Sequence, residues 1–361
     1  MESGGLRTVL VTGGTGFLGR NLVEFLQNHG IRVICLVRPG SKYEHLKSAG
    51  AKLVLGDFTS EEALQEAVEG VDAVFHLAAC TTSVSFEKML QVNCDFTENL
   101  VKVCAAQPKP PVFVYVSSLA ATGPSTVQRP HEEADPCRPV SWYGKTKLEA
   151  ERRLRTCAGR LPITVIRPPM LFGPHDHEVR KWLNAIRNTG IFFIPFLRTF
   201  RFSMAHSEDV CELLLLAAEK GERLPELANE ETKKTDEKII SEVPANGGQG
   251  IYFVSQTEHP TFMEMGRLFG KALGRKFTLI LPATPFVLWT ICVGMEFRAK
   301  FTGKLSMLNY DKFREICAGS WSCSAEKARN QLGFRNHHSL LEQIQSTVLW
   351  LRNQEKNPRK S

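Results

Sequence analysis

Three features are scarce in this sequence of 361 residues: charge of one sign, paired cysteine motifs and N-terminal leader features. The net charge of +7 is mild, and no stretch combines clustered basic residues with aromatic ones, so we predict no nucleic-acid partner. Such a charge suits an anionic small molecule or a membrane surface. The ten cysteines form no Cys-X-X-Cys pair, which favours reduced, buried thiols in a cytosolic protein. No charged region precedes an apolar run at the N-terminus, so we expect no secretory signal.

Short apolar runs alternate with amphipathic segments over about the first 165 residues. The apolar runs predict strands, and the segments between them show the spacing of helices that bury one face. This alternation predicts an α/β fold with a doubly wound parallel sheet covered by helices on both faces. The predicted strands are 6–12, 31–37, 52–55, 72–77, 112–117 and 162–167, and the predicted helices are 17–29, 60–69, 86–106 and 140–158.

The alternation loosens after about residue 168. Residues 219–242 contain eight acidic and five basic side chains, and we interpret about 220–250 as a solvated insertion. Residues 277–295 contain no charged residue. We favour a buried helix over a substrate cleft for this segment. A helix lying on a membrane surface and a membrane span are the alternatives.

Three glycines at intervals of three residues, Gly13, Gly16 and Gly19, follow the first predicted strand and open the first predicted helix. Gly13 allows a sharp turn, Gly16 lets a pyrophosphate approach the backbone, and Gly19 lets the helix lie against the sheet. The helix N-terminus then offers N–H groups and a positive dipole end to phosphates. In this position the pattern predicts a dinucleotide-binding, Rossmann-type fold.

Two residues at later strand ends bear on the adenosine half of such a ligand. Arg38 follows the second strand, where an NAD site would have an acidic residue for the ribose 2′-hydroxyl. Because an arginine can bind a 2′-phosphate, we predict NADP, with NAD as the alternative if Arg38 is merely a solvated loop residue. Asp57 follows the third strand and either accepts from the adenine amino group or serves as a turn or capping residue.

A proton-handling group is predicted from Tyr143 and Lys147, which share one face of a helix. A nearby ammonium favours the phenolate, so we expect Lys147 to lower the pKa of Tyr143. Ser118 ends a strand at the ligand-binding edge of the sheet and could hold a substrate oxygen. Asn93 either orients Lys147 through a water or packs a helix. Tyr43 and Lys47 have the same spacing without a serine-bearing strand end, so spacing alone is weak evidence.

Other polar residues rank lower as functional candidates. His175, Asp176 and His177 have no companions at ligand spacing, so we predict no metal site. His76 follows an apolar strand, and we interpret it as a packed histidine beside the cofactor.

Several motifs together resemble the extended short-chain dehydrogenase/reductases, in the NAD-dependent epimerase/dehydratase group. They are TGGTGFLG (12–19), GDF (56–58), HLAA (76–79), VNCDFTENL (92–100), YVSSLAATG (115–123), YGKTK (143–147) and RPPMLFGP (167–174). The resemblance implies a Rossmann domain at 1–167 with a return segment near 200–219, and a mainly substrate-binding domain at 168–361. It also implies a catalytic triad of Ser118, Tyr143 and Lys147, with Asn93 as a further candidate. The cofactor contacts predicted in all are Gly13, Thr15, Gly16, Phe17, Leu18, Gly19, Arg38, Asp57, Phe58, Leu77, Ala78, Ala79, Tyr143, Lys147 and Pro168.

Within that family, the LVRP strand end and the apolar C-terminal region resemble the branch of 3β-hydroxysteroid dehydrogenases and dihydroflavonol reductases. Ser118 is followed by Leu119 and Ala120, not by the acidic pair of sugar dehydratases. The resemblance therefore implies an NADP-preferring oxidoreductase that acts on a secondary alcohol or ketone of a hydrophobic substrate. A nucleotide-sugar epimerase and a non-catalytic dinucleotide-binding protein are the alternatives. We further expect a cytoplasmic protein, a homodimer, and membrane contact, if any, through 277–295.

Overall fold

The computed structural model describes residues 5–83, 85–195, 199–226, 245–302 and 309–356. Its centre is a parallel sheet of seven strands in the order β10-β6-β5-β4-β1-β2-β3. The strand order reverses between β1 and β4, and ligands of such sheets bind at the carboxyl ends of the strands beside this point. The strands are β1 (Thr8–Thr12), β2 (Arg32–Val37), β3 (Lys52–Leu55), β4 (Ala73–His76), β5 (Val112–Val116), β6 (Ile163–Arg167) and β10 (Ile251–Phe253).

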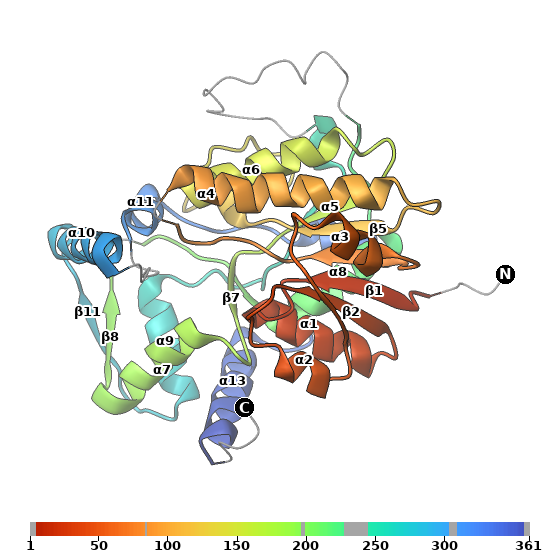
Figure 1. The fold of residues 1–361 in the computed structure, drawn as a ribbon. Coiled ribbons are helices and arrows are strands. Elements are labelled where there is room, and N and C mark those ends of the chain that lie inside the picture. The colour runs from red at the N-terminus through yellow and green to blue at the C-terminus, as the bar shows by residue number, and fades with distance from the viewer. Residues whose placement is uncertain (1–4, 84, 196–198, 227–244, 303–308, 357–361) are drawn as a thin grey trace.

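Helices cover both faces of this sheet (Figure 1). One face carries α3 (Glu61–Val68), α5 (Phe96–Ala105) and α6 (Trp142–Arg155), with α4 (Phe86–Leu90) and a π-helical turn (Gln91–Asp95) leading into α5. The other face carries α1 (Phe17–Asn28), α2 (Glu44–Ser48), α8 (Ser207–Lys220) and α12 (Glu326–Leu332). The predicted doubly wound α/β class is therefore confirmed.

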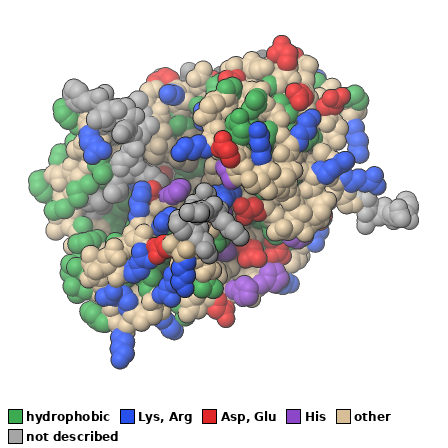
Figure 2. Space-filling view, turned by 60° about the horizontal axis from the view of Figure 1, so that its bottom comes forward, with side chains coloured by type: hydrophobic (Ala, Val, Ile, Leu, Met, Phe, Trp, Pro, Cys, Tyr) green, Lys and Arg blue, Asp and Glu red, His purple; other side chains and the backbone are tan. Residues whose placement is uncertain are grey.

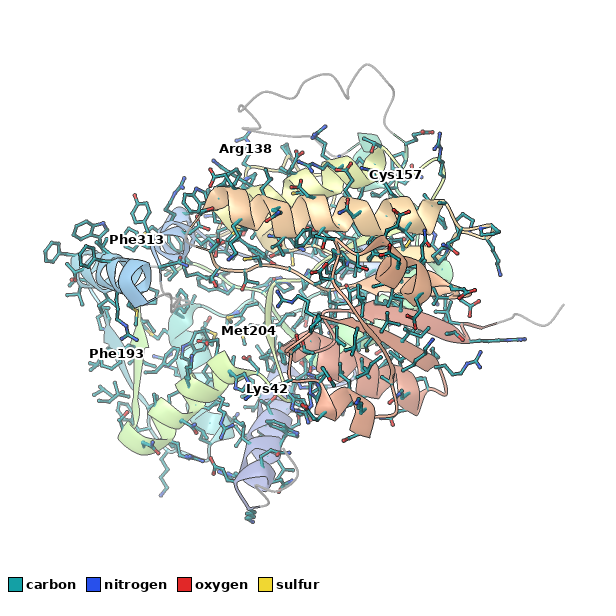
Figure 3. The ribbon with its side chains drawn as sticks, viewed as in Figure 1. Lys42, Arg138, Cys157, Phe193, Met204 and Phe313 are labelled. Atoms are coloured by element: carbon teal, nitrogen blue, oxygen red, sulfur yellow. The ribbon has the colours of Figure 1, made fainter. Side chains whose placement is uncertain are left out.

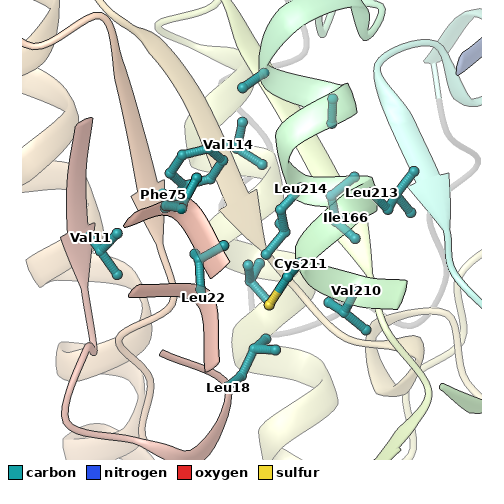
Figure 4. Close-up of a cluster of buried hydrophobic side chains, with 14 of the residues drawn as sticks. Val11, Leu18, Leu22, Phe75, Val114, Ile166, Val210, Cys211, Leu213 and Leu214 are labelled. Carbon is teal, nitrogen blue, oxygen red and sulfur yellow. The ribbon is translucent and has the colours of Figure 1, made fainter. Parts of the chain in front are cut away.

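Alternation along each strand explains why the sheet has two cores. Val9 and Val11 of β1 point to the core under α1 and α8, whereas Leu10 points to the core under α3, α5 and α6. In the first core, Leu22 of α1 and Leu214 of α8 pack over the strands (Figure 4). Because both faces are buried, the strands are apolar along their whole length, as the sequence predicts.

A smaller, mostly helical part lies beside the carboxyl ends of the strands (Figure 1). Its core is formed by α7 (His177–Thr189), β8 (Ile191–Ile194), α9 (Phe262–Ala272) and α13 (Leu340–Lys356). The remaining elements there are β7 (Met170–Phe172), β9 (Met204–His206), β11 (Leu279–Pro282), α10 (Pro285–Thr302) and α11 (Tyr310–Ala318). β7 pairs with β9, and β11 pairs with β8. Two short 3₁₀ turns complete the described chain, Leu119–Ala121 and Ala245–Gly248.

The favoured buried helix at 277–295 is wrong, because this segment divides into β11 and α10, and large apolar side chains of α10 are exposed. No helix in the described ranges is long and apolar enough to cross a bilayer. Most of the charged insertion predicted at 220–250 lies outside the described residues, and its described ends contact the sheet. There, Glu222 N–H donates to the Tyr252 hydroxyl at 2.9 Å.

Candidate active site

The glycine-rich turn between β1 and α1 has the geometry of an anion cradle. Gly13 has a φ of 73°, and a Cβ there would lie 2.7 Å from the backbone nitrogen of Ala78. A Cβ on Gly19 would lie 2.1 Å from the Gly13 carbonyl oxygen, so α1 can pack against the turn only if this residue is glycine. Gly16 is exposed, and it is the N-cap of α1, so the first turn of the helix has no capping side chain in front of it. The turn at Gly13 and the close packing at Gly19 match their predicted roles, and the approach of a pyrophosphate to Gly16 stays a prediction.

The strand ends around this turn are joined by His76, which is buried. Thr97 Oγ1 donates to the Asn93 carbonyl, so it accepts from His76 Nε2–H at 2.9 Å. His76 Nδ1 then accepts from the Thr12 hydroxyl at 2.7 Å. Burial lowers the pKa of His76 to about 3. The residue is thus a neutral packing histidine, which joins β1 and β4 below the edge of the proposed site.

On the adenosine side, Arg38 is exposed at the end of β2, and Asp57 lies at the end of β3. Asp57 Oδ1 accepts from the backbone N–H and the hydroxyl of Thr59, at 2.8 and 2.5 Å. These hydrogen bonds, and more weakly the charge of Arg38, lower the pKa of Asp57. The turn role of Asp57 is therefore visible in the structure, and a contact with adenine stays a prediction.

The other predicted cofactor contacts surround the same sheet edge. Thr15 is exposed, and Phe17 and Leu18 begin α1. Leu77 N–H donates to the Thr12 carbonyl, and the Pro168 carbonyl accepts from Leu119 N–H. The ring of Phe58 meets His76 edge-on, and the half-buried residues Ala78 and Ala79 follow β4.

Ser118 and Tyr143 are brought together by the tight packing of α6 on the turn after β5. A Cβ on Gly144 would lie 2.2 Å from the Ala120 carbonyl oxygen, so only glycine lets the first turn of α6 come this close. The Ser118 side chain lies close enough to the Tyr143 phenol to lower its pKa, against the effect of burial. Ser118 Oγ also accepts from Ala120 N–H at 3.1 Å. Two hydroxyls from segments 25 positions apart in sequence therefore lie side by side at the carboxyl edge of the sheet.

Lys147 lies one helical turn after Tyr143 and is almost fully buried. Its ammonium donates to the Val116 carbonyl at 2.7 Å and lies 4.3 Å from the centre of the Tyr115 ring. Burial lowers the pKa of Lys147 to about 7, partly opposed by the charge of Glu151.

The expected lowering of the Tyr143 pKa by Lys147 is wrong for this structure. Burial raises the pKa of Tyr143, and the neighbouring Ser118 side chain only partly opposes this effect. The physical reason is placement, because the Lys147 ammonium is held by Val116 and Tyr115 and not by the phenol. Tyr143 is therefore a neutral phenol, which is the form that donates a proton.

A buried ion pair behind the site was not predicted from the sequence. Arg167 at the end of β6 holds Glu151 of α6 through two contacts, at 2.5 and 3.0 Å, and both side chains are fully buried. The Ser117 hydroxyl donates to the same carboxylate at 2.5 Å. The ion pair thus joins Ser117, the residue before Ser118, to Glu151, which lies one helical turn after Lys147 on α6. The available sequence signal is the position of Glu151, four residues after Lys147 on a helix.

Asn93 has a packing role in the structure. Its amide N–H groups donate to the Cys80 carbonyl and to Thr146 Oγ1, both at 3.0 Å, and its carbonyl oxygen accepts from Cys80 N–H at 2.7 Å. Asn93 thus ties the segment after β4 to α6. A water-mediated role toward Lys147 stays a prediction.

Asp311, on α11, is a second residue that the sequence did not reveal. Its carboxylate accepts from the backbone N–H groups of Trp142 at 2.7 Å and Tyr143 at 3.3 Å. Ser141 caps the same helix end by accepting from Gly144 N–H. A carboxylate at this position also complements the positive end of the helix dipole. Asp311 therefore holds the backbone of the candidate catalytic tyrosine from 168 positions away in the chain.

Residues 175–177, for which the sequence predicts no metal site, make separate contacts. Asp176 caps α7 by accepting from Glu178 N–H at 2.8 Å. His175 has a φ of 68°, packs edge-on against Trp350, and lies 3.7 Å from Glu24. His177 is exposed.

Comparison with known proteins points in the same direction as this geometry. The model of the NAD dependent epimerase/dehydratase family matches residues 9–229. The chain is 32% identical over 215 residues to the 4-hydroxy-2-methyl-3-oxo-4-farnesyl-3,4-dihydroquinoline-1-oxide ketoreductase of Stigmatella aurantiaca, covering 58% of this chain and 64% of that relative. It is 29% identical over 227 residues to the decarboxylating sterol-4-alpha-carboxylate 3-dehydrogenase of Dictyostelium discoideum, covering 60% and 69%.

The fold is also shared with solved structures. The UDP-glucose 4-epimerase of Thermotoga maritima superposes with a TM-score of 0.72 at 20% identity, covering 96% of this chain and 99% of that one. At this identity the likeness concerns the fold.

Proposed function

Because this chain belongs to the NAD dependent epimerase/dehydratase family, we propose that it is an oxidoreductase for a secondary alcohol or ketone of a hydrophobic substrate. Family membership confirms the predicted resemblance to the extended short-chain dehydrogenase/reductases, and it supports an enzyme that uses a nicotinamide dinucleotide. The observation that carries the proposal is the packing of α6 on the turn after β5, which brings Tyr143 next to Ser118 at the same edge of the sheet as the glycine-rich turn. The farnesyl and sterol groups in the names of two relatives support a hydrophobic substrate.

The residues of the glycine-rich turn fit a dinucleotide. Gly13 and Gly19 leave no room for a Cβ, so the turn lies tight against the sheet, and Gly16 leaves the N-terminus of α1 open to a pyrophosphate. When bound there, the nicotinamide would supply or accept the hydride.

In the reductive direction, this chain's residues handle the substrate oxygen and its proton. The Ser118 hydroxyl holds the oxygen, and Tyr143 donates the proton to it. The raised pKa of Tyr143 keeps that proton in place until an alkoxide, a much stronger base, forms next to it. Asp311 and Ser141 fix the first turn of α6, so the tyrosine meets the substrate without first having to be ordered.

Replacing Tyr143 tests this proposal directly. We expect Tyr143→Phe to lower turnover by at least ~10²-fold in an assay of NADPH or NADH oxidation across a panel of apolar ketones. Tyr43→Phe is the matched control, since Tyr43 has the same four-residue spacing to a lysine and lies on the adenosine side. Equal turnover in Tyr143→Phe and wild type would refute the mechanism.

For the cofactor, we propose a preference for NADP through Arg38. Its exposed guanidinium at the end of β2 can donate two parallel hydrogen bonds to a 2′-phosphate. Arg38→Asp should shift the ratio of kcat/KM values toward NAD by at least ~10-fold, which is the effect of about 1.4 kcal/mol. Arg160→Asp, at an exposed arginine before β6, is the charge-matched control. An unchanged ratio in Arg38→Asp would contradict the assignment.

The second candidate reaction is the epimerisation of a nucleotide sugar, because the family name includes epimerases. An epimerase would use the same tyrosine and would leave the total amount of cofactor unchanged. Product analysis with an isotopically labelled sugar nucleotide separates the two reactions. Conversion of the sugar without net cofactor oxidation would favour the epimerase.

A further inference from the structure

Large apolar side chains are exposed mainly in one region of the molecule. Of the twelve such side chains in the described part of the chain, ten belong to β8, to residues 277–297 or to the start of α11. We call this set the α10 surface. Figure 2 shows hydrophobic side chains gathered on the same side of the molecule that carries α10, β8 and β11 in Figure 1, and Figure 3 labels Phe193 and Phe313 there. Its members are Phe193, Phe277, Leu279, Phe286, Val287, Trp289, Ile291, Val293, Phe297 and Tyr310.

The side chains of this surface are highly exposed. Phe277 is 74% exposed, Phe286 71% and Phe193 66%. Between Phe286 and Met295 the helix has no charged residue, and it turns Cys292 inward while its neighbours Ile291 and Val293 are exposed. An apolar patch of this kind marks an interaction site, whereas single exposed apolar residues such as Leu55 and Leu349 need no explanation.

The charge around this surface has one dominant sign. Residues 267–314 contain nine Lys and Arg but only two Asp and Glu, so this segment alone accounts for the whole net charge of +7. Among the described residues, Arg267, Lys271, Arg275 and Lys276 are exposed on or just after α9, and Arg298 is exposed on α10. Aromatic and aliphatic side chains next to exposed basic ones are the composition of elements that lie on anionic membranes.

We propose that the α10 surface binds to an anionic phospholipid bilayer, with α10 lying along the interface. Its apolar side chains enter the region between headgroups and acyl chains, and the basic side chains of residues 267–276 meet the lipid phosphates. A second copy of the chain fits this surface less well. In a symmetric dimer both facing surfaces would carry the same excess of basic residues, and neither would supply acidic partners for the other.

The position of this surface gives membrane binding a consequence for the active site. α10 contacts α11, and Asp311 of α11 holds the backbone of Trp142 and Tyr143. The membrane-facing helix is therefore only one helix away from the candidate catalytic tyrosine. If the proposed function is correct, an apolar substrate dissolved in the bilayer reaches the site on this side. The binding itself does not depend on the reaction.

Vesicle sedimentation tests the proposal with the full-length protein. We expect the wild type to sediment with phosphatidylcholine vesicles containing phosphatidylserine, more weakly with phosphatidylcholine alone, and less as salt rises. The double variant Phe286→Glu/Phe297→Glu should bind at least about tenfold more weakly. Leu55→Glu/Leu349→Glu, at similarly exposed apolar positions elsewhere, should bind like the wild type.

A second pair of variants tests the electrostatic part. Arg275→Gln/Lys276→Gln should lose the preference for phosphatidylserine, while Lys52→Gln/Lys181→Gln, which alters two exposed lysines elsewhere, should keep it. Thermal unfolding and the reduction of a water-soluble ketone establish whether each variant is folded. They also separate failure of membrane binding from failure of the proposed reaction. Absence of vesicle binding by the wild type would overturn the proposal. So would unchanged binding of the Phe286→Glu/Phe297→Glu variant, or a dimer in sedimentation velocity that this variant dissociates.

Discussion

The candidate active site and the α10 surface are opposites in how they distribute polarity. Behind the active site, Lys147, Glu151 and Arg167 are at most 1% exposed, and hydrogen bonds hold their charged groups. On the α10 surface, Phe277 and Phe286 are more than two-thirds exposed. Both arrangements reverse the usual pattern of apolar interior and charged exterior. Buried charges cost stability unless they are paired, and exposed aromatic rings contribute little to folding, so the two regions should respond to substitution in different ways.

The largest expected effect is on the buried ion pair. Glu151→Gln leaves the Arg167 charge buried without its counter-ion, and we expect a loss of about 3–5 kcal/mol in the free energy of unfolding. Glu178→Gln, in the exposed pair with Lys181, should cost less than about 1 kcal/mol. Urea unfolding measures both. Replacing the pair together, as Glu151→Leu/Arg167→Met, should recover much of the loss. If Glu151→Gln were as stable as Glu178→Gln, the buried ion pair would not be needed for the stability of the folded protein.

Two substitutions in the glycine-rich turn should have different effects, one on stability and the other on ligand binding. A Cβ at Gly19 meets the backbone, so Gly19→Ala should cost stability near the upper end of ~1–3 kcal/mol. At Gly16 the nearest atom is 3.3 Å away, so Gly16→Ala should fold normally but bind the dinucleotide less tightly. Urea unfolding and a fluorescence titration with NADPH give the two readouts. Equal loss of stability in both variants would contradict this division.

His76 should give the stability a pH dependence. Its pKa is about 3 in the folded protein, against an ordinary value of 6.5. Between these values the unfolded chain binds a proton that the folded chain does not, so stability falls as pH falls below 6.5. From pH 7 to pH 5 this contribution is about 2 kcal/mol. The His76→Asn variant should lack this pH dependence of stability. The His337→Asn variant, at an exposed histidine, should keep it.

Nuclear magnetic resonance provides an independent measurement for His76. Its imidazole signals should not titrate between pH 8 and pH 5. A midpoint near pH 6.5 for His76 would show that the ring is not held neutral by its surroundings.

The smallest effect is expected on the α10 surface. Phe286→Ser should change the free energy of unfolding by no more than ~0.5 kcal/mol, because the ring makes few contacts in the folded chain. Phe172→Ala, at a fully buried ring, should cost about 3–5 kcal/mol. Thermal or urea unfolding checks both. A large loss of stability in Phe286→Ser would mean that the ring stabilises the folded chain, which would argue against a role in binding a partner.

The features that could be predicted from the sequence are those encoded locally. The strands, the glycine-rich turn and the helix carrying Tyr143 and Lys147 all follow from spacing over a few residues, and the structure has each of them. The pairing of β10 with β6 and the contact of Asp311 with α6 join segments far apart in sequence, and no local pattern encodes either contact. The α10 segment differs from the predicted buried helix for another reason. Absence of charge predicts contact with something apolar, and it does not say whether that contact is the protein's own core.

The contact between Asp311 and α6 also constrains the order of events during synthesis. A ribosome will have released most of the Rossmann strands before residue 311 is made, yet the helix end that carries Tyr143 lacks its carboxylate partner until then. The strand Ile251–Phe253 likewise joins the sheet edge late. A growing chain can therefore form most of the Rossmann sheet early, whereas the helix end that carries Tyr143 gains its carboxylate partner only after residue 311 has been made.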